Sequence, residues 1–193
     1  PFLPNVSRKV IALSILTFLF ITNTFGINAF SKIQNAAVII LVISLTAFTA
    51  VGLTKLDGNY FDPSQFMTHG AIGLWQASVL MSYTCDGAQY VTQMSGEAKN
   101  PTRDIPRVML FSTLGVSLFY GLIGVVASGV LPVAEVAGQP MTVVANAILS
   151  KPLYYLFCIG GGWMALLTTL NSSIATCTKP LMQACIDGWY PRS

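Results

Sequence analysis

The fold of this chain is decided by the stretch from Gly70 to Arg107, which reads GAIGLWQASVLMSYTCDGAQYVTQMSGEAKNPTRDIPR. It begins as an apolar helix, meets Asp86-Gly87 midway, and resumes as a second half-helix that stops at Asn100-Pro101. Irregular backbone at membrane depth is tolerated only where protein or a water-filled cavity surrounds it, and an ionisable residue there indicates a functional site by default. Helices broken in this way hold substrates near the bilayer midplane in membrane transporters. The stretch therefore predicts a binding site at the break.

Composition predicts an all-α polytopic membrane protein. The chain is 53% hydrophobic and only 9% charged, whereas roughly 25% of the residues of a soluble domain are charged. Several runs reach the roughly 20 apolar residues with which a helix crosses a bilayer. The net charge of +3 is small and dispersed, so it does not indicate nucleic acid as a partner. The lipid bilayer is the expected environment.

We expect one membrane domain over residues 1–193, and the start at Pro1 predicts an internal fragment of a longer protein. The predicted helices cover residues 10–24, 35–53, 70–98 with a break at 84–88, 109–131 and 153–186, and a short surface helix covers 134–150. Small residues in the span 109–131 are expected to let helices approach closely. They are Gly115, Ser117, Gly121, Gly124, Ser128 and Gly129.

The side chains offer little for catalysis or metal binding. The sequence shows no nucleophile–base pair, no metal-ligand cluster and no Gly-rich phosphate loop. Its one histidine, His69, is either a solvated loop residue or a ligand or proton relay. The cysteines Cys85, Cys158, Cys177 and Cys185 lie in apolar spans and are expected to be small buried hydrophobes. We therefore expect no enzyme, no cofactor and no bound metal.

The roles of two sets of polar residues remain open. The last predicted span carries Thr168, Thr169, Asn171, Ser172, Ser173, Thr176 and Thr178. Their hydroxyls either bond the i−4 carbonyls of their own helix or line a polar pathway. The segment after the break carries Glu97, Lys99, Arg103 and Arg107, and a weak excess of positive charge places this segment in the cytosol. It is either a solvated loop that fixes topology or an inner gate whose ion pairs break when the site opens inward.

Three segments resemble motifs of one family of membrane proteins. Glu97–Pro106 (EAKNPTRDIP) resembles the E-x-K-N-P-x-R-x-I-P segment that ends the sixth transmembrane helix of the amino acid–polyamine–organocation (APC) permeases. Asn23 to Gln34 (NTFGINAFSKIQ) is similar to the N-x-x-G-x-x-x-x-x-K-x-Q entry to their fifth helix, and Asn171 to Pro191 is similar to the end of their eighth. The resemblance covers essentially the whole chain. It implies helices four to eight of a LeuT-type inverted-repeat bundle whose first helices this chain lacks.

The resemblance also implies a substrate site at the break. The family's unwound centre of the sixth helix corresponds to Thr84, Cys85, Asp86, Gly87 and Ala88, and the site includes the flanking Tyr83 and Gln89. Tyr83 matches an aromatic residue that closes over the substrate in the family's arginine/agmatine antiporter, whereas Gln89 stands where several members carry an acid. The carbonyls and the negative dipole end of the first half-helix suit an ammonium group. Asp86 is either a buried structural acid, or a residue that contacts the substrate amine directly or takes part in coupling.

The function implied by the resemblance is transport of amino acids or related amines by alternating access, in the plasma membrane. Some proton-coupled members carry a lysine in the fifth helix, but the matched position here is Leu41. Exchange, sodium coupling through Asn171, Ser172 and Ser173, or another proton site then remain open, so Na+ or H+ is the expected coupling ion. The alternatives are an obligate amino acid exchanger and a non-transporting amino acid sensor on the same scaffold.

Overall fold

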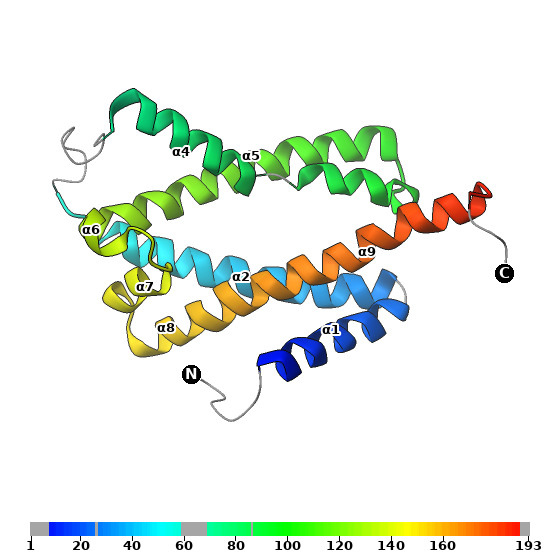
Figure 1. Cartoon of the computed structure of the whole chain (residues 1–193), viewed down its shortest axis with the longest axis horizontal. Coiled ribbons are helices and arrows are strands. Elements are labelled where there is room, and N and C mark those ends of the chain that lie inside the picture. Colours follow the sequence, from blue (N-terminus) through cyan, green and yellow to red (C-terminus); the bar gives the residue numbers. More distant parts are fainter. Residues whose placement is uncertain (1–7, 26, 59–68, 86, 190–193) are drawn as a thin grey trace. The chain divides into compact units, whose positions relative to one another are not determined.

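The computed structural model describes residues 8–25, 27–58, 69–85 and 87–189 (Figure 1). In these residues the chain forms helices and no strand, which confirms the predicted all-α class. The elements are α1 (Arg8–Thr24), α2 (Ile27–Leu53), α4 (Gly70–Thr84), the 3₁₀ helix η1 (Ala88–Glu97), α5 (Pro101–Gly129), α6 (Val133–Val136), α7 (Thr142–Ile148), α8 (Lys151–Leu156), the π-helix η2 (Phe157–Trp163) and α9 (Met164–Ile186).

Within the described residues, three helical stretches are long and apolar enough to cross a membrane. They are Phe30–Leu53, Pro101–Gly129 and Lys151–Ile186, with mean hydropathies of 2.5, 1.9 and 1.5. Lys9–Thr24 is apolar but shorter, and α4 has 15 residues. The predicted polytopic membrane protein is therefore supported by helix length and composition.

Two helices begin earlier than the sequence analysis predicted. Helix α2 starts at Ile27 instead of residue 35, because no proline or glycine interrupts the segment before Gly52. Helix α5 starts at Pro101 instead of residue 109. Proline suits the first helical position, and the carbonyl of Asn100 accepts the N–H groups of Arg103 and Asp104 at 3.1 and 2.9 Å. Polar residues in these two segments had favoured turns.

The short surface helix expected at 134–150 is divided into α6 and α7. The segment between them contains Gly138, whose φ of +73° suits glycine, and Pro140. These two residues prevent one continuous helix.

The chain forms two compact units, and each has its own internal packing. One unit comprises Pro1–Ile43 and Ile159–Ser193, and the other comprises Ser44–Cys158. In the first unit α1 packs against α9. In the second unit η1 runs beside α5, to which a short turn joins it (Figure 1).

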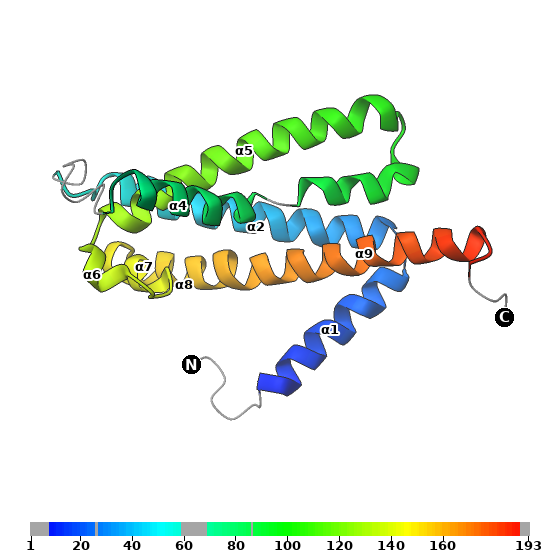
Figure 2. The same ribbon diagram turned by 45° about the horizontal axis from the view of Figure 1, so that its top comes forward.

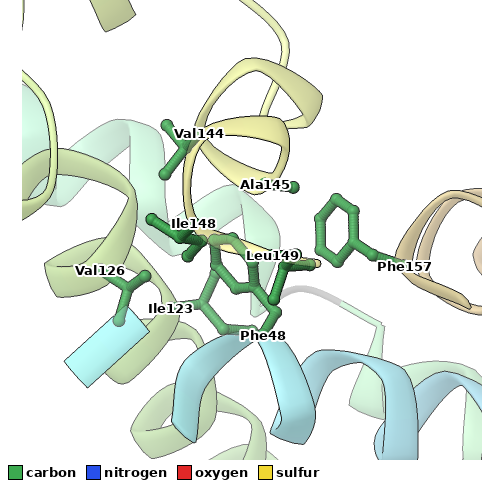
Figure 3. Close-up of a cluster of buried hydrophobic side chains, with 8 residues drawn as sticks. All are labelled: Phe48, Ile123, Val126, Val144, Ala145, Ile148, Leu149 and Phe157. Atoms are coloured by element: carbon green, nitrogen blue, oxygen red, sulfur yellow. The ribbon is translucent and has the colours of Figure 1, made fainter. Parts of the chain in front are cut away.

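The core of the Ser44–Cys158 unit forms where α7 packs against α2 and α5. Figure 3 shows its eight buried side chains, Phe48, Ile123, Val126, Val144, Ala145, Ile148, Leu149 and Phe157. The rings of Phe48 and Phe157 lie with their centroids 4.8 Å apart. Three of the eight residues come from the seven-residue helix α7. This helix is therefore part of the core.

Two polar contacts hold the first residues after α2 in the same unit. The Lys55 ammonium donates a hydrogen bond to the Ile148 carbonyl at 3.0 Å, at the C-terminal end of α7. A cation is favourable there because the helix dipole is negative at that end. The backbone N–H of Asp57 donates to the Gly129 carbonyl at the end of α5, at 2.9 Å.

Gly52 lies where α2 packs closely against α5 in this unit. A Cβ atom placed on Gly52 of α2 would overlap the side chain of Val126 on α5. By contrast, apart from the adjacent residues and nearby backbone of the same helix, no described atom lies within 4 Å of a Cβ placed on Gly115, Gly121 or Gly124. Within the described chain, the predicted close packing at those three glycines is therefore not found.

We predict that Gly52→Ala destabilises the protein by about 1–3 kcal/mol, because the added methyl group forces Val126 out of place. Thermal unfolding of the purified protein in detergent measures the effect. The matched control is Gly124→Ala, which adds the same methyl group to open space in α5. Equal stability of the two variants would show that α2 and α5 are not in close contact at Gly52.

Candidate functional site

The break in the Gly70–Arg107 stretch lies between α4 and η1. Helix α4 ends at Thr84, and the N–H of Cys85 turns back to the Ser82 carbonyl at 3.1 Å. Asp86 lies outside the described residues. Gly87 then has φ +136° and ψ −22°, a conformation that L-residues rarely adopt, and η1 follows from Ala88. The backbone thus changes direction at a position that requires glycine.

Cys85 is tied to the neighbouring helix. The hydroxyl of Ser117 on α5 donates a hydrogen bond to the Cys85 sulfur at 3.3 Å. From the sequence, Ser117 was expected only to let helices pack closely. Its contact with the break could not be foreseen, because it depends on how α5 returns beside η1.

An open hollow of about 530 Å³ lies at the end of α4. Ligand pockets usually measure about 300–1,000 Å³. The hollow is lined by Val79, Ser82, Tyr83 and Cys85. Tyr83 and Cys85 belong to the predicted site, whereas Val79 and Ser82 were missed. Both lie within about one turn of those residues on α4, and that spacing was the available signal.

The other predicted site residues near the break differ in exposure. Tyr83 is 82% exposed, so its ring is available to a ligand. Ala88 is half-buried at the start of η1. Gln89 is exposed, and its carbonyl accepts the Thr92 hydroxyl at 2.6 Å. The structure therefore brings Tyr83 and Cys85 to one hollow and leaves Gln89 on the surface of η1.

A second polar cluster lies in the other unit and centres on Asn171 of α9. Asn171 is 1% exposed. Its side-chain oxygen accepts the Asn23 amide of α1 at 2.9 Å, and its own amide donates to the Gln34 oxygen of α2 at 2.9 Å. Gln34 in turn donates to the Ser172 hydroxyl at 3.0 Å. We call these four residues the amide chain; Figure 2 shows the end of α1 where it meets α9 and the start of α2.

The amide chain links two of the sequence segments that carried the family resemblance. Asn23 and Gln34 are the first and last residues of the N-x-x-G-x-x-x-x-x-K-x-Q segment, and Asn171 begins the segment similar to the eighth helix. Neither Asn23 nor Gln34 was a predicted site residue. The family resemblance identified both segments, but it did not indicate that their side chains form hydrogen bonds with each other.

The polar side chains of α9 fall into two sets: some bond carbonyls of their own helix, and others bond a neighbouring helix. Five of them donate to carbonyls of their own helix: Thr168, Thr169, Ser173, Thr176 and Thr178. Such bonds satisfy a hydroxyl without any partner outside the helix. Asn171 and Ser172 instead bond to α2. The inter-helix polar contacts of this patch are thus concentrated at two residues.

The charged segment around Arg103 shows no gate in the described residues. Lys99 and Arg103 are exposed, and no ion pair joins either of them to another described side chain. Glu97 is the last residue of η1. An inner gate built from these residues stays a prediction.

The cysteines and the other potential ligands form no metal site in the described part of the chain. No group of three or more His, Cys, Asp or Glu residues lies close enough to hold a metal ion there. Cys85 and Cys158 are half-buried. Cys177 and Cys185 are exposed, so the expectation that all four cysteines are buried was wrong. Both cysteines lie on α9, so an exposed thiol there can face lipid or another helix.

Comparison with known proteins gives a consistent set of relatives. A family model described as amino acid permease matches residues 2–193. The branched-chain amino acid permease BcaP of Bacillus subtilis is 28% identical over 145 residues, which are 74% of this chain and 30% of that protein. The mitochondrial cationic amino acid transporter 3 of Arabidopsis thaliana is 31% identical over 136 residues, which are 69% of this chain and 22% of that protein.

The chain therefore spans less than a third of the length of these two relatives. No solved structure gives a significant match. Both relatives are named as permeases or transporters, in agreement with the expectation that the chain is not an enzyme.

We predict that Asn171→Ala lowers the stability of the protein by about 1–3 kcal/mol, because it leaves the partly buried Gln34 carbonyl without its donor. Thermal unfolding in detergent measures the loss. Ser173→Ala is the control, since its hydroxyl bonds only Thr169 of the same helix and should change stability by no more than about 0.5 kcal/mol. Indistinguishable unfolding of the two variants would contradict the role of the amide chain.

Proposed function

Because this chain belongs to the amino acid permease family, we propose that the whole protein carries amino acids or related amines across a membrane by alternating access. The observation that carries the proposal is the interrupted helix between Thr84 and Ala88. At that point the chain combines a helix C-terminus, a glycine with positive φ and an open hollow. A transporter needs such a site, accessible from one side at a time, and no covalent chemistry.

The proposed site recognises the amine of the substrate. The C-terminal end of α4 carries the negative end of the helix dipole, so a positively charged ammonium is favoured beside it. Cys85 and the exposed Tyr83 line the hollow at this end of the helix, and Tyr83 supplies an aromatic face that can cover a ligand. Ala88 follows at the start of η1. Asp86 and Gln89 complete the proposed set, with Asp86 as a contact of the amine or as a structural acid.

The substrate class of the proposal is broader than that of any single relative. Relatives are named for branched-chain and for cationic amino acids, so the family admits apolar and charged side chains. A membrane location follows from the apolar helices. The plasma membrane is our proposal, although some relatives are named as mitochondrial or vacuolar.

Coupling to Na+ or H+ and obligate exchange remain as two forms of the proposed transport. No lysine or arginine is present in the α2 segment from Asn35 to Leu53, where some proton-coupled members of the family carry one. This observation favours exchange or a coupling site elsewhere. A sensor on the same scaffold would bind amino acid without moving it.

The test of the proposed function uses the full-length protein in liposomes. Entry of labelled amino acids is followed into empty vesicles and into vesicles preloaded with unlabelled amino acids, with and without sodium or pH gradients. Uptake that needs preloading indicates an exchanger, and gradient-driven uptake into empty vesicles indicates a symporter. Binding without uptake in any condition would contradict transport and favour a sensor.

We predict that Gly87→Leu abolishes uptake in this assay while the protein still inserts into the membrane. The reason is that a leucine cannot adopt φ +136° without strain, so the break must change shape. Gly96→Leu is the control, because Gly96 lies in η1 without a positive φ and a Cβ there meets open space. Unchanged transport by Gly87→Leu would rule out the break as the substrate site.

A further inference from the structure

Helix α5 contacts the interrupted helix on both sides of Gly87. After the break, η1 runs beside α5 (Figure 1). Before the break, the hydroxyl of Ser117 on α5 donates a hydrogen bond at 3.3 Å to the sulfur of Cys85, the residue that caps α4. All of these residues belong to the compact unit Ser44–Cys158. Helix α5 is therefore placed to fix the geometry of the break.

The Ser117 hydroxyl differs from those of the other serines of α5. A hydroxyl in a helix often bonds a carbonyl three or four residues earlier in the same helix. Ser112 donates in this way to Met109 at 3.2 Å, and Ser128 donates to Gly124 at 2.7 Å. Ser117 instead donates to the sulfur of a residue outside its own helix, and sulfur is a weak acceptor. The contact therefore depends on how α5 packs beside the break.

Cys85 connects this contact to the lining of the hollow. The hollow is lined by Val79, Ser82, Tyr83 and Cys85, of which the first three are exposed and Cys85 is half-buried. A cysteine side chain has one rotatable bond with three staggered positions. The Ser117 hydroxyl stabilises the position in which the sulfur lies towards α5. It thereby sets where the thiol lies in the lining.

We propose that Ser117 is a positioning residue of the substrate site: it holds the Cys85 thiol, and with it the end of α4, in the arrangement that lines the hollow. The proposal rests on the proposed function, in which the substrate occupies the break. The hollow is lined by residues 79–85, so Ser117 acts through Cys85. Loss of its hydroxyl lowers the fraction of the protein whose site is ready to bind, and the apparent affinity falls by that fraction.

The first test measures the Kd of the full-length protein in detergent for leucine or arginine, by isothermal titration calorimetry. Ser117→Ala should raise the Kd about threefold, near the lower limit for a hydrogen bond, because sulfur is a weak acceptor. Ser117→Thr keeps the hydroxyl and should restore the wild-type Kd. Ser112→Ala is the control, because that hydroxyl bonds Met109 of its own helix. A wild-type Kd for Ser117→Ala, or an equal loss in Ser117→Thr, would overturn the positioning role.

The second test asks whether Ser117 acts through Cys85. In a Cys85→Ala background the hydroxyl has no sulfur to hold, so Ser117→Ala should raise the Kd no further. In the liposome assay, Ser117→Ala should raise the KM for uptake by the same factor and leave kcat unchanged. Additive effects of the two substitutions, or a lower kcat with an unchanged KM, would show that Ser117 does not position the thiol for binding.

The third test measures the contact itself and depends on neither binding nor transport. In Ser117→Cys a second thiol replaces the hydroxyl that lies 3.3 Å from the Cys85 sulfur, so oxidation with copper phenanthroline should join the two as a disulfide. Ser112→Cys on the same helix should not form this cross-link, and mass spectrometry of the digested protein measures both. A folded Ser117→Cys protein without the cross-link would overturn the inference. A wild type that neither binds nor transports would contradict the proposed function, while the cross-link would still test the contact.

Discussion

A bilayer offers the peptide backbone no hydrogen-bond partner, and the chain depends on meeting this constraint wherever its helices change course. At the end of α4 the N–H of Cys85 bonds Ser82, and at the start of η1 the N–H of Tyr90 bonds the Gly87 carbonyl at 3.1 Å. Gly87, which precedes η1, has a φ of +136°. Each end of the interruption thus keeps a backbone hydrogen bond, and an open hollow lies at the end of α4.

In the other unit, polar side chains find hydrogen-bond partners on neighbouring helices. An apolar contact between helices gains little in lipid, because the lipid is equally apolar, so polar contacts matter for which helices pair. The amide chain joins α1, α2 and α9 through four side chains, and the amides of Asn171 and Gln34 each donate one hydrogen bond and accept another. Because the chain starts at a backbone carbonyl, its direction is unique.

The sequence predicted the features that depend on local composition. The apolar runs predicted the helical class. Asp86-Gly87 predicted the position of the break, because a charge and a glycine interrupt a helix in lipid. The start of α2 was missed because Ser31 and Gln34 are compatible with either a helix or a turn. The bond from Asn171 to Gln34 joins residues 137 positions apart in the chain, and Gly52 meets Val126 across two helices. Such contacts depend on tertiary packing, which no local pattern encodes.

The central claim is that the substrate occupies the break between α4 and η1, and modification of Cys85 tests it most directly. Cys85 carries a thiol, is half-buried and lines the hollow with Tyr83, whereas Cys177 on α9 is exposed and serves as the internal reference. The measurement is the rate at which a thiol reagent modifies each cysteine of the full-length protein, with and without a saturating amino acid. We expect slower modification of Cys85 and an unchanged rate at Cys177 when the amino acid is bound. An unchanged rate at Cys85 in the presence of a transported amino acid would contradict it.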